Sequence, residues 1–134
     1  GLAVAVEDGL LVPVIHHADR LGLRHIATQR KAIVDRALAG KSTVADLQDG
    51  TITISNLGMF GIDKFSAIVN PPQAAILAVG RIAKQVIAHN GATAVQPMMS
   101  LTLSCDHRVV DGARGAQFLQ TVVQLIEDPL AILD

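Results

Sequence analysis

Apolar residues alternate with polar ones, or run without interruption, over several short stretches that are typical of β-strands. Thr51–Ser55 alternates as a half-buried strand does, and Ala74–Val79 is continuously apolar, which predicts a central strand. A further strand is expected over Met98–Cys105. Near the N-terminus, Leu2–Val6 and Leu10–Val14 are separated by a Glu-Asp-Gly turn, so we expect a hairpin there.

Two longer stretches repeat apolar residues at the spacing of an amphipathic helix. The first is expected to begin after an Asp19 N-cap and to end near Ala39, before Gly40. Its predicted apolar face comprises Leu23, Ile26, Ala27, Val34, Ala37 and Leu38. The second spans Gly112–Glu127, and its predicted inward residues are Ala116, Leu119, Val123 and Ile126. Between the two helices, a short helical turn is expected over Ser42–Leu47. An excursion of the chain at the sheet edge is expected over Lys84–Val95, with a turn at His89–Ala92.

These elements predict an α/β fold, a two-layer α+β sandwich in which helices flank a mixed β-sheet. The 134 residues suit one domain that buries about two thirds of its unfolded surface. The apolar runs are far shorter than the ~20 residues that span a bilayer, and no leader-like segment opens the chain. A net charge of −1 and three Phe as the only aromatic residues argue against nucleic-acid or membrane binding. A single cysteine fits a reducing compartment.

The stretch LSCDHRVVDG, over Leu103–Gly112, lies where a strand is expected to end and a helix to begin. Such a junction is rigid and accessible, which suits a reactive side chain. Spacing alone leaves its polar residues open. His107 can be a base or a hydrogen-bonded structural residue, and Asp111 can be catalytic or a helix N-cap. Cys105 alternates with two leucines and is interpreted as a small buried hydrophobe.

The remaining histidines do not predict a metal site. They show no ligand spacing with carboxylates or cysteines, and we expect them at the surface or in loops. They are His16, His17, His25 and His89.

Three motifs carry a resemblance to a known family: SNLGMFGI (Ser55–Ile62), NPPQAAILAVG (Asn70–Gly80) and LSCDHRVVDGA (Leu103–Ala113). In this order they resemble the catalytic domain of the dihydrolipoamide acyltransferase components of 2-oxo acid dehydrogenase complexes. Within that family the chain looks most like the pyruvate dehydrogenase acetyltransferases. The wider family includes chloramphenicol acetyltransferase and implies its fold. The resemblance also implies that residues 1–134 are the C-terminal part of the catalytic domain, without its N-terminal part and without the lipoyl and peripheral-subunit-binding domains.

The resemblance implies roles for two residues in the transfer of an acyl group, acetyl above all, between dihydrolipoamide and coenzyme A. His107 would be the general base that takes the proton from the coenzyme A thiol. A free thiol has a pKa of about 8.5 and a free imidazole one of about 6.5, so base assistance is needed near neutral pH. Ser55 would donate a hydrogen bond to the tetrahedral oxyanion. From the residues alone, Ser55 can also be a strand-end serine that satisfies a turn.

The other signature residues have supporting roles in this interpretation. Asp111 would hold the active-site turn through an ion pair or a cap. Its arginine partner would lie in the missing segment or would be Arg108 or Arg114. Asp106 would have a positioning role at most.

Positions that bind coenzyme A in relatives match Asn56, Gly80 and Ile82 here, and Ser55 faces the same site. The Gly58–Gly61 loop would shape the acyl and lipoyl side. The expected cofactors are coenzyme A as a substrate and a lipoyl group carried on a domain absent from this chain, with no metal.

The family's assembly implies a homotrimer in which Ser55 and His107 meet from different subunits. Trimers build a larger core, and the apolar tail Pro129–Leu133 resembles the segment that packs between them. The 2-oxo acid decarboxylase/dehydrogenase and dihydrolipoamide dehydrogenase components would bind through the missing domains, and neither nucleic acid nor a membrane is an expected partner. The expected location is the cytoplasm if the source is bacterial, which we prefer, or the mitochondrial matrix if it is eukaryotic.

Two alternatives remain at this stage. A related acyltransferase for branched-chain or succinyl groups keeps the chemistry and changes only the acyl pocket, which is a matter of about 1–3 kcal/mol per one or two methylenes. A non-catalytic structural core subunit shares the NLGMFGI motif but loses the histidine of the HxxxDG signature. This chain has both His107 and the Asp111-Gly112 pair.

Overall fold

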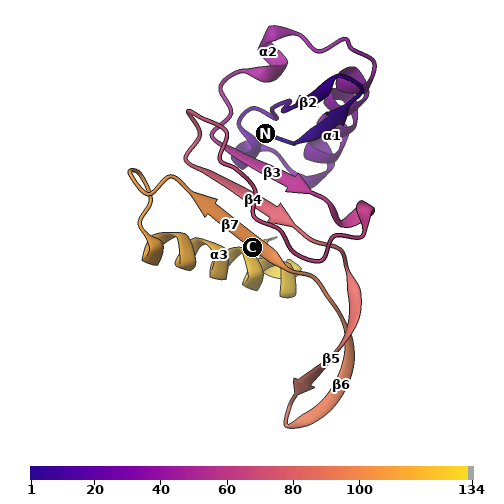
Figure 1. The fold of residues 1–134 in the computed structure, drawn as a ribbon, viewed down its shortest axis with the longest axis vertical. Helices are drawn as coiled ribbons and strands as arrows, with labels where there is room; N and C mark the ends of the chain where they lie inside the picture. The colour runs from indigo at the N-terminus through magenta and orange to yellow at the C-terminus, as the bar shows by residue number, and fades with distance from the viewer. Residues whose placement is uncertain (133–134) are drawn as a thin grey trace.

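A three-stranded mixed sheet forms the centre of the molecule in the computed structural model, which describes residues 1–132. Its strands are β3 (Ile52–Asn56), β4 (Ala75–Val79) and β7 (Leu101–Cys105), in the order β3-β4-β7. β4 pairs parallel with β3 and antiparallel with β7. Figure 1 shows α3 beside β7, and α1 at the opposite edge, beyond β3. The predicted mixed sheet flanked by helices is therefore confirmed.

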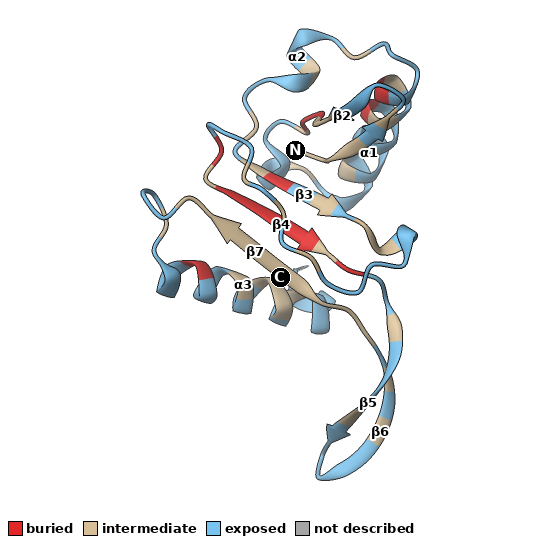
Figure 2. Ribbon diagram, in the orientation of Figure 1, coloured by how far each residue is buried: buried red, intermediate tan, exposed pale blue. Residues whose placement is uncertain are grey.

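The sheet centre is β4, as its continuous apolar run predicts. Ala75 to Ala78 are buried, and Figure 2 shows this strand as the main buried segment of the sheet. Beside it the Thr53 hydroxyl, which is fully buried, donates to Gln73 Oε1 at 2.5 Å. This pairing satisfies two polar groups that would otherwise be costly to bury. It fastens the segment before β4 to the middle of β3.

The N-terminal hairpin is shorter than its sequence pattern predicts. Strands β1 (Val4–Val6) and β2 (Gly9–Leu11) pair antiparallel, and Gly9 adopts a φ of +135° at the turn. Upstream of β1, Leu2 forms a parallel bridge with Ile54, so the chain start continues the central sheet beyond β3. The Gly1 nitrogen donates to the Ile52 carbonyl at 2.6 Å, which adds to this contact.

The first long helix begins later than predicted. α1 spans Leu23–Leu38 with Gly22 as N-cap, whereas Asp19 lies in a separate 3-10 turn over Ala18–Arg20. Ile33 and Ala37 are its buried residues. The predicted apolar face is wrong at three positions, because Leu23, Ala27 and Leu38 are exposed. The two leucines occupy the helix ends, where helical spacing continues but no neighbouring element covers them.

A short helix, α2 (Val44–Leu47), follows with a reciprocal capping box between Thr43 and Asp46. Asp46 also accepts two hydrogen bonds from the Arg36 guanidinium, at 2.6 and 3.0 Å. These bonds, first of all those from Arg36, hold the pKa of the Asp46 carboxyl well below its usual range. The end of α1 is thereby tied to α2.

A long hairpin leaves the body after β4 (Figure 1). Its strands β5 (Ala83–His89) and β6 (Ala92–Met98) pair over seven positions, and Asn90 and Gly91 turn between them with positive φ. The predicted edge excursion is confirmed. The predicted single strand Met98–Cys105 is wrong, because Met98 ends β6 and a separate strand, β7, begins at Leu101.

Helix α3 spans Gly112–Glu127, as predicted, and packs along β7. Its only buried residue is Gly115, while Leu119 and Val123 are half-buried. The predicted inward positions Ala116 and Ile126 are exposed instead. Of the apolar tail, residues Pro129–Ile132 form a 3-10 turn after α3, and Leu133 lies outside the described residues. Within residues 1–132 no helix is both long and apolar enough to cross a membrane.

Candidate active site

His107 lies in the tight turn that joins β7 to α3. The turn is fixed by backbone bonds: Asp106 N donates to the Ala74 carbonyl at 2.8 Å, and the Val109 and Val110 amides donate to the Asp106 carbonyl. His107 is exposed there, and it lines a cavity of about 230 Å³ between β7 and α3. The sequence placed this histidine at a strand–helix junction, and the structure has the same arrangement.

Asp106 is held by its neighbour Arg108. The Asp106 carboxylate accepts from the Arg108 backbone amide at 3.0 Å and from Arg108 Nη2 at 2.6 Å. The guanidinium bonds, followed by the backbone bond, lower the pKa of Asp106 to about 2. The pKa of Arg108 is correspondingly raised. Arg108, one of the partners expected for Asp111, is thus paired with Asp106.

Asp111 is the N-cap of α3. Its carboxylate accepts from the Arg114 backbone amide at 3.0 Å, and Arg114 Nε lies 3.5 Å from Asp111 Oδ2. The cap that spacing allowed is present, and Arg114 is its arginine partner among the described residues. Asp111, which lies four residues after His107, therefore fixes where α3 begins.

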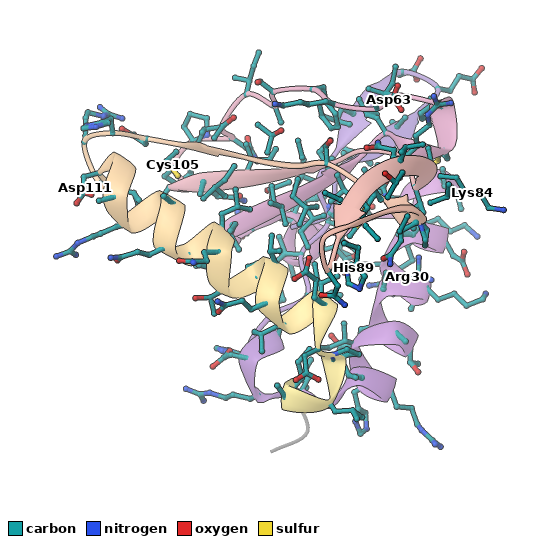
Figure 3. All side chains as sticks on the ribbon, turned by 90° about the horizontal axis from the view of Figure 1, so that it is seen from below. Arg30, Asp63, Lys84, His89, Cys105 and Asp111 are labelled. Atoms are coloured by element: carbon teal, nitrogen blue, oxygen red, sulfur yellow. The ribbon has the colours of Figure 1, made fainter. Side chains whose placement is uncertain are left out.

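Helix α3 lies close to β7 at the cavity beside His107. Gly115 brings the helix close to the strand, so that a Cβ at Gly115 would lie 3.4 Å from Cys105 Sγ. Cys105 is half-buried, whereas the sequence predicted a small, buried apolar residue at this position. Figure 3 shows Cys105 and Asp111 at the same end of the molecule.

Ser55 lies at the other candidate locus, near the end of β3. It is half-buried, and the next residue, Asn56, turns the chain by accepting from Gly58 N at 2.8 Å through its side-chain oxygen. A cavity of about 540 Å³ opens beside this turn. Its lining includes the predicted Asn56, Gly80 and Ile82, together with Gly58, Met59, Gly61, Val79, Arg81 and Met99. Arg81 was missed by sequence reasoning, although it lies between two positions that were named.

Sheet register separates the two loci within one chain. Ser55 pairs with Ala78, which pairs with Thr102, whereas Cys105 pairs with Ala75 at the opposite end of β4. Thr102 and Cys105 are about 10 Å apart at ~3.3 Å per residue, and His107 lies two residues further on. Figure 1 accordingly shows the exit of β3 and the β7–α3 turn at opposite ends of the sheet. The structure does not bring Ser55 and His107 together in one chain.

Within residues 1–132, no three His, Cys, Asp or Glu side chains gather as a metal site requires.

Solved structures define the class of this fold. The dihydrolipoamide acetyltransferase of Azotobacter vinelandii superimposes with a TM-score of 0.95 at 39% identity, over 100% of this chain and 55% of that one. Crystallographic and enzymatic work on it concerned a serine, a histidine and an asparagine in the catalytic mechanism. The cubic core of a pyruvate dehydrogenase multienzyme complex superimposes equally well, with a TM-score of 0.95 at 38% identity and the same coverage. The chain therefore has the fold of an acyltransferase core domain.

Sequence relatives narrow the class to a family. The model of the 2-oxoacid dehydrogenases acyltransferase (catalytic domain) family matches residues 1–133, so the chain belongs to that family. The acetyltransferase component of the Rickettsia bellii pyruvate dehydrogenase complex is 44% identical over 98% of this chain. A mitochondrial counterpart in Schizosaccharomyces pombe is 47% identical over 98%. A succinyltransferase component of the Haemophilus influenzae 2-oxoglutarate dehydrogenase complex is 43% identical over 98%.

The matched region is only a part of each of these proteins. The chain spans 32% of the length of the Rickettsia bellii and Haemophilus influenzae relatives and 28% of the yeast one. It matches the model of the catalytic domain over residues 1–133 and does not span the whole length of these proteins.

Proposed function

We propose that this chain is the C-terminal part of a catalytic domain that transfers an acyl group between dihydrolipoamide and coenzyme A. One observation carries the proposal: His107 is presented at an exposed turn with the spacing of a known catalytic set. In the Azotobacter vinelandii acetyltransferase the serine precedes the histidine by 52 positions and the asparagine follows it by four. Ser55, His107 and Asp111 have the same two separations.

His107 acts as the general base in the proposed reaction. Its imidazole takes the proton of the coenzyme A thiol, and the thiolate sulfur attacks the thioester carbonyl carbon of the acyl-dihydrolipoamide. The tetrahedral intermediate then expels the dihydrolipoamide sulfur, which takes the proton back from the imidazolium. No bond to the protein forms in this sequence of steps, so one base is sufficient.

Ser55 and Asp111 assist that base in different ways. The Ser55 hydroxyl donates a hydrogen bond to the oxygen that becomes negative in the tetrahedral intermediate, which is typically worth about 2.7–4 kcal/mol. Asp111 acts as a positioning residue, because its carboxylate caps α3 and anchors the turn that carries His107. A carboxylate here and an asparagine in the Azotobacter vinelandii protein are both good helix caps.

Coenzyme A fits the larger cavity, which is next to Ser55. Its volume of about 540 Å³ lies in the ordinary range for small-molecule sites, and Asn56, Gly80 and Ile82 line it. Because the Asn56 side-chain oxygen is used in the turn, its amide nitrogen is the group that faces a ligand. The exposed Met59 in the Gly58–Gly61 loop supplies apolar surface toward the acyl and lipoyl side.

Acetyl is the proposed acyl group, because three of the relatives described above are acetyltransferases or acetyltransferase components. Succinyl is the second candidate acyl group, because the succinyltransferase component of Haemophilus influenzae is 43% identical. A branched-chain substrate would need the same chemistry with a different pocket. Comparing kcat/KM for acetyl-, succinyl- and isobutyryl-dihydrolipoamide separates these substrates. A purely structural subunit would show turnover with none of them.

A second copy of the chain completes the proposed site. Ser55 and His107 lie at opposite ends of one sheet, so a neighbouring copy has to supply the other residue. The β5–β6 hairpin gives a further argument, because an isolated two-stranded hairpin is marginally stable in water. Its cross-strand pair Val86 and Val95 is 72% and 63% exposed, as expected for surface covered by a partner copy. We therefore propose the homotrimer of the family.

The remaining partners follow from the same family relationship. Trimers would build a larger core, as in the cubic core of the solved relative, in part through the tail Pro129–Leu133. The 2-oxo acid decarboxylase/dehydrogenase and dihydrolipoamide dehydrogenase components would bind through further domains that also carry the lipoyl group. Relatives occur in bacteria and in mitochondria. The cytoplasm of a bacterium is our preferred location, and the mitochondrial matrix is the eukaryotic equivalent.

Replacing His107 by Ala in the assembled protein tests the proposed chemistry. We expect kcat to fall by about 10²–10⁴-fold while the melting temperature is unchanged, because His107 is exposed and removal of a base affects only the reaction. His25→Ala, an exposed histidine on α1, is the matched control and keeps its activity. An His107→Ala protein that retains turnover within about threefold of wild type would remove His107 from the mechanism.

A further inference from the structure

An ion pair at the rim of the larger cavity has no role in the chemistry above. Arg81 donates through Nε to Asp63 Oδ1 and through Nη2 to Asp63 Oδ2, the second bond at 3.3 Å. Arg81 itself lines the cavity. Figure 3 shows Asp63 at the same end of the molecule as Lys84, near the base of the β5–β6 hairpin, and far from Asp111.

The pair joins two segments whose backbones are already in close contact. Leu57 N donates to the Val79 carbonyl at 3.2 Å, and Arg81 N donates to the Ile62 carbonyl at 2.8 Å. A Cβ at Gly80 would lie 2.0 Å from the Asp63 carbonyl oxygen, so no side chain fits between the segments. The loop over residues 57–63 therefore packs directly against Gly80 and Arg81, the exit of β4.

Among residues 1–132, the Asp63–Arg81 pair is the only side-chain hydrogen bond or ion pair between this loop and that exit. The loop begins two residues after Ser55 and carries the exposed Met59 and Phe60, which gain little from burial. An opening of the loop would move one wall of the cavity together with the backbone next to Ser55. A bidentate pair across the gap opposes that opening.

We propose that Asp63 and Arg81 are positioning residues that latch the 57–63 loop onto the exit of β4 and so hold Ser55 and the cavity wall in their working geometry. This inference rests on the proposed acyl transfer and adds two residues to it. The side chains are 64% and 46% exposed, so the latch is of the weak, salt-sensitive kind. Its effect on the rate is correspondingly modest.

A double-mutant cycle on the assembled protein tests the latch. Asp63→Asn and Arg81→Gln are each expected to lower kcat about two- to fivefold, with little change in KM for coenzyme A. The double variant should be no slower than either single variant, because both remove the same bond. Asp35→Asn, which breaks the exposed Lys31–Asp35 pair on α1, is the matched control and should leave kcat unchanged.

Two outcomes would overturn the latch in an active enzyme. If the two single effects multiply in the double variant, the residues act independently. If Arg81→Gln raises KM for coenzyme A while Asp63→Asn does not change kcat, Arg81 contacts the ligand directly and Asp63 has no role.

Backbone amide exchange separates failure of the latch from failure of the proposed function. The amides of Leu57 and Arg81 donate across the two segments and report opening of the loop without any reaction. We expect both to exchange faster in each single variant and no faster still in the double. Were the wild type inactive as a transferase, the proposed function would be lost, and unchanged exchange in the variants would reject the latch as well.

Discussion

Two aspartates flank His107, and their carboxylates have different partners. Asp106 binds the guanidinium and the backbone amide of Arg108, whereas Asp111 caps α3 and lies beside Arg114. Sequence spacing allowed the Asp111 cap beside a catalytic role and left open which arginine this aspartate would meet. The backbone path of the turn decides this, because it places the Arg108 guanidinium against Asp106 and leaves Arg114 beside Asp111.

The Asp106–Arg108 pair predicts a stability effect with a defined pH range. The pKa of Asp106 is lowered from 3.8 to about 2, so the folded state prefers the ionised form. The stabilisation is complete above pH ~4 and is lost as the pH falls from ~4 to ~2. We expect Asp106→Asn to lower Tm by a few degrees at pH ~6, and the difference from wild type to vanish near pH ~2.

Thermal unfolding of both proteins between pH ~2 and ~7 makes this comparison. The wild-type protein acts as its own reference for general acid destabilisation, since only the difference between the two curves is interpreted. A difference that stays constant down to pH ~2 would mean that ionisation of Asp106 is not its cause.

At the scale of elements, close backbone contact shapes the exit of β4. Gly80 N donates to the Ser100 carbonyl at 3.0 Å, so the glycine lies between the start of β7 and the loop that follows β3. A Cβ at this position would be 2.0 Å from a backbone oxygen, which cannot move as the end of a flexible side chain can. Glycine is thus required at position 80 because a Cβ would clash with the backbone, and not because of a positive φ.

Gly80→Ala is accordingly expected to destabilise the fold by about 1–3 kcal/mol, the usual cost of overpacking a close contact. Gly112→Ala is the matched control. A Cβ there meets nothing within 4 Å, at the first position of α3, so this variant should be neutral or slightly stabilising. Urea unfolding of both variants measures the difference. Equal stability of the two would show that the loop moves aside without cost.

Helix α1 illustrates where an element-scale prediction is wrong. Its spacing correctly indicated Ile26, Val34 and Ala37 as the covered side. Ile33, the other buried residue of the helix, was not in the predicted face. Periodicity defines a stripe along a helix, whereas the covered area depends on where β1 and its neighbours pack. The two buried residues of α1, Ile33 and Ala37, both lie in its C-terminal half.

At the scale of the whole molecule, the separation of Ser55 from His107 predicts complementation between two inactive variants. Ser55→Ala should lower kcat by about 10²–10³-fold, and His107→Ala by a comparable factor. After dissociation and reassembly of an equal mixture, roughly a quarter of the interfaces join an intact Ser55 to an intact His107. Activity should therefore recover to about a quarter of the wild-type rate.

The control for this experiment is wild type taken through the same dissociation and reassembly, with exchange of subunits measured by mass spectrometry. If exchange is complete and the mixture stays at the level of the single variants, one chain would hold the whole site. The cross-subunit role of Ser55 would then be abandoned.

The sequence by itself determined the identity of most elements and the residues of the reactive turn. Alternation at Thr51–Ser55, the apolar run at Ala74–Val79 and the Asn90-Gly91 turn are local signals, and each matches the structure closely. These signals are local because burial of a strand face or a turn conformation depends on neighbouring residues. The motif around His107 likewise lies within a few positions.

The tertiary structure alone decided how these pieces are placed against one another. Parallel pairing of β4 with β3 and antiparallel pairing with β7 put Ser55 and His107 at opposite ends of the sheet. It also brought Asp63 to Arg81 across 18 positions and buried Thr53 against Gln73. Register between distant segments is set by backbone hydrogen bonds and packing across the whole sheet, and a local hydrophobic pattern specifies which face is buried but not which end meets which.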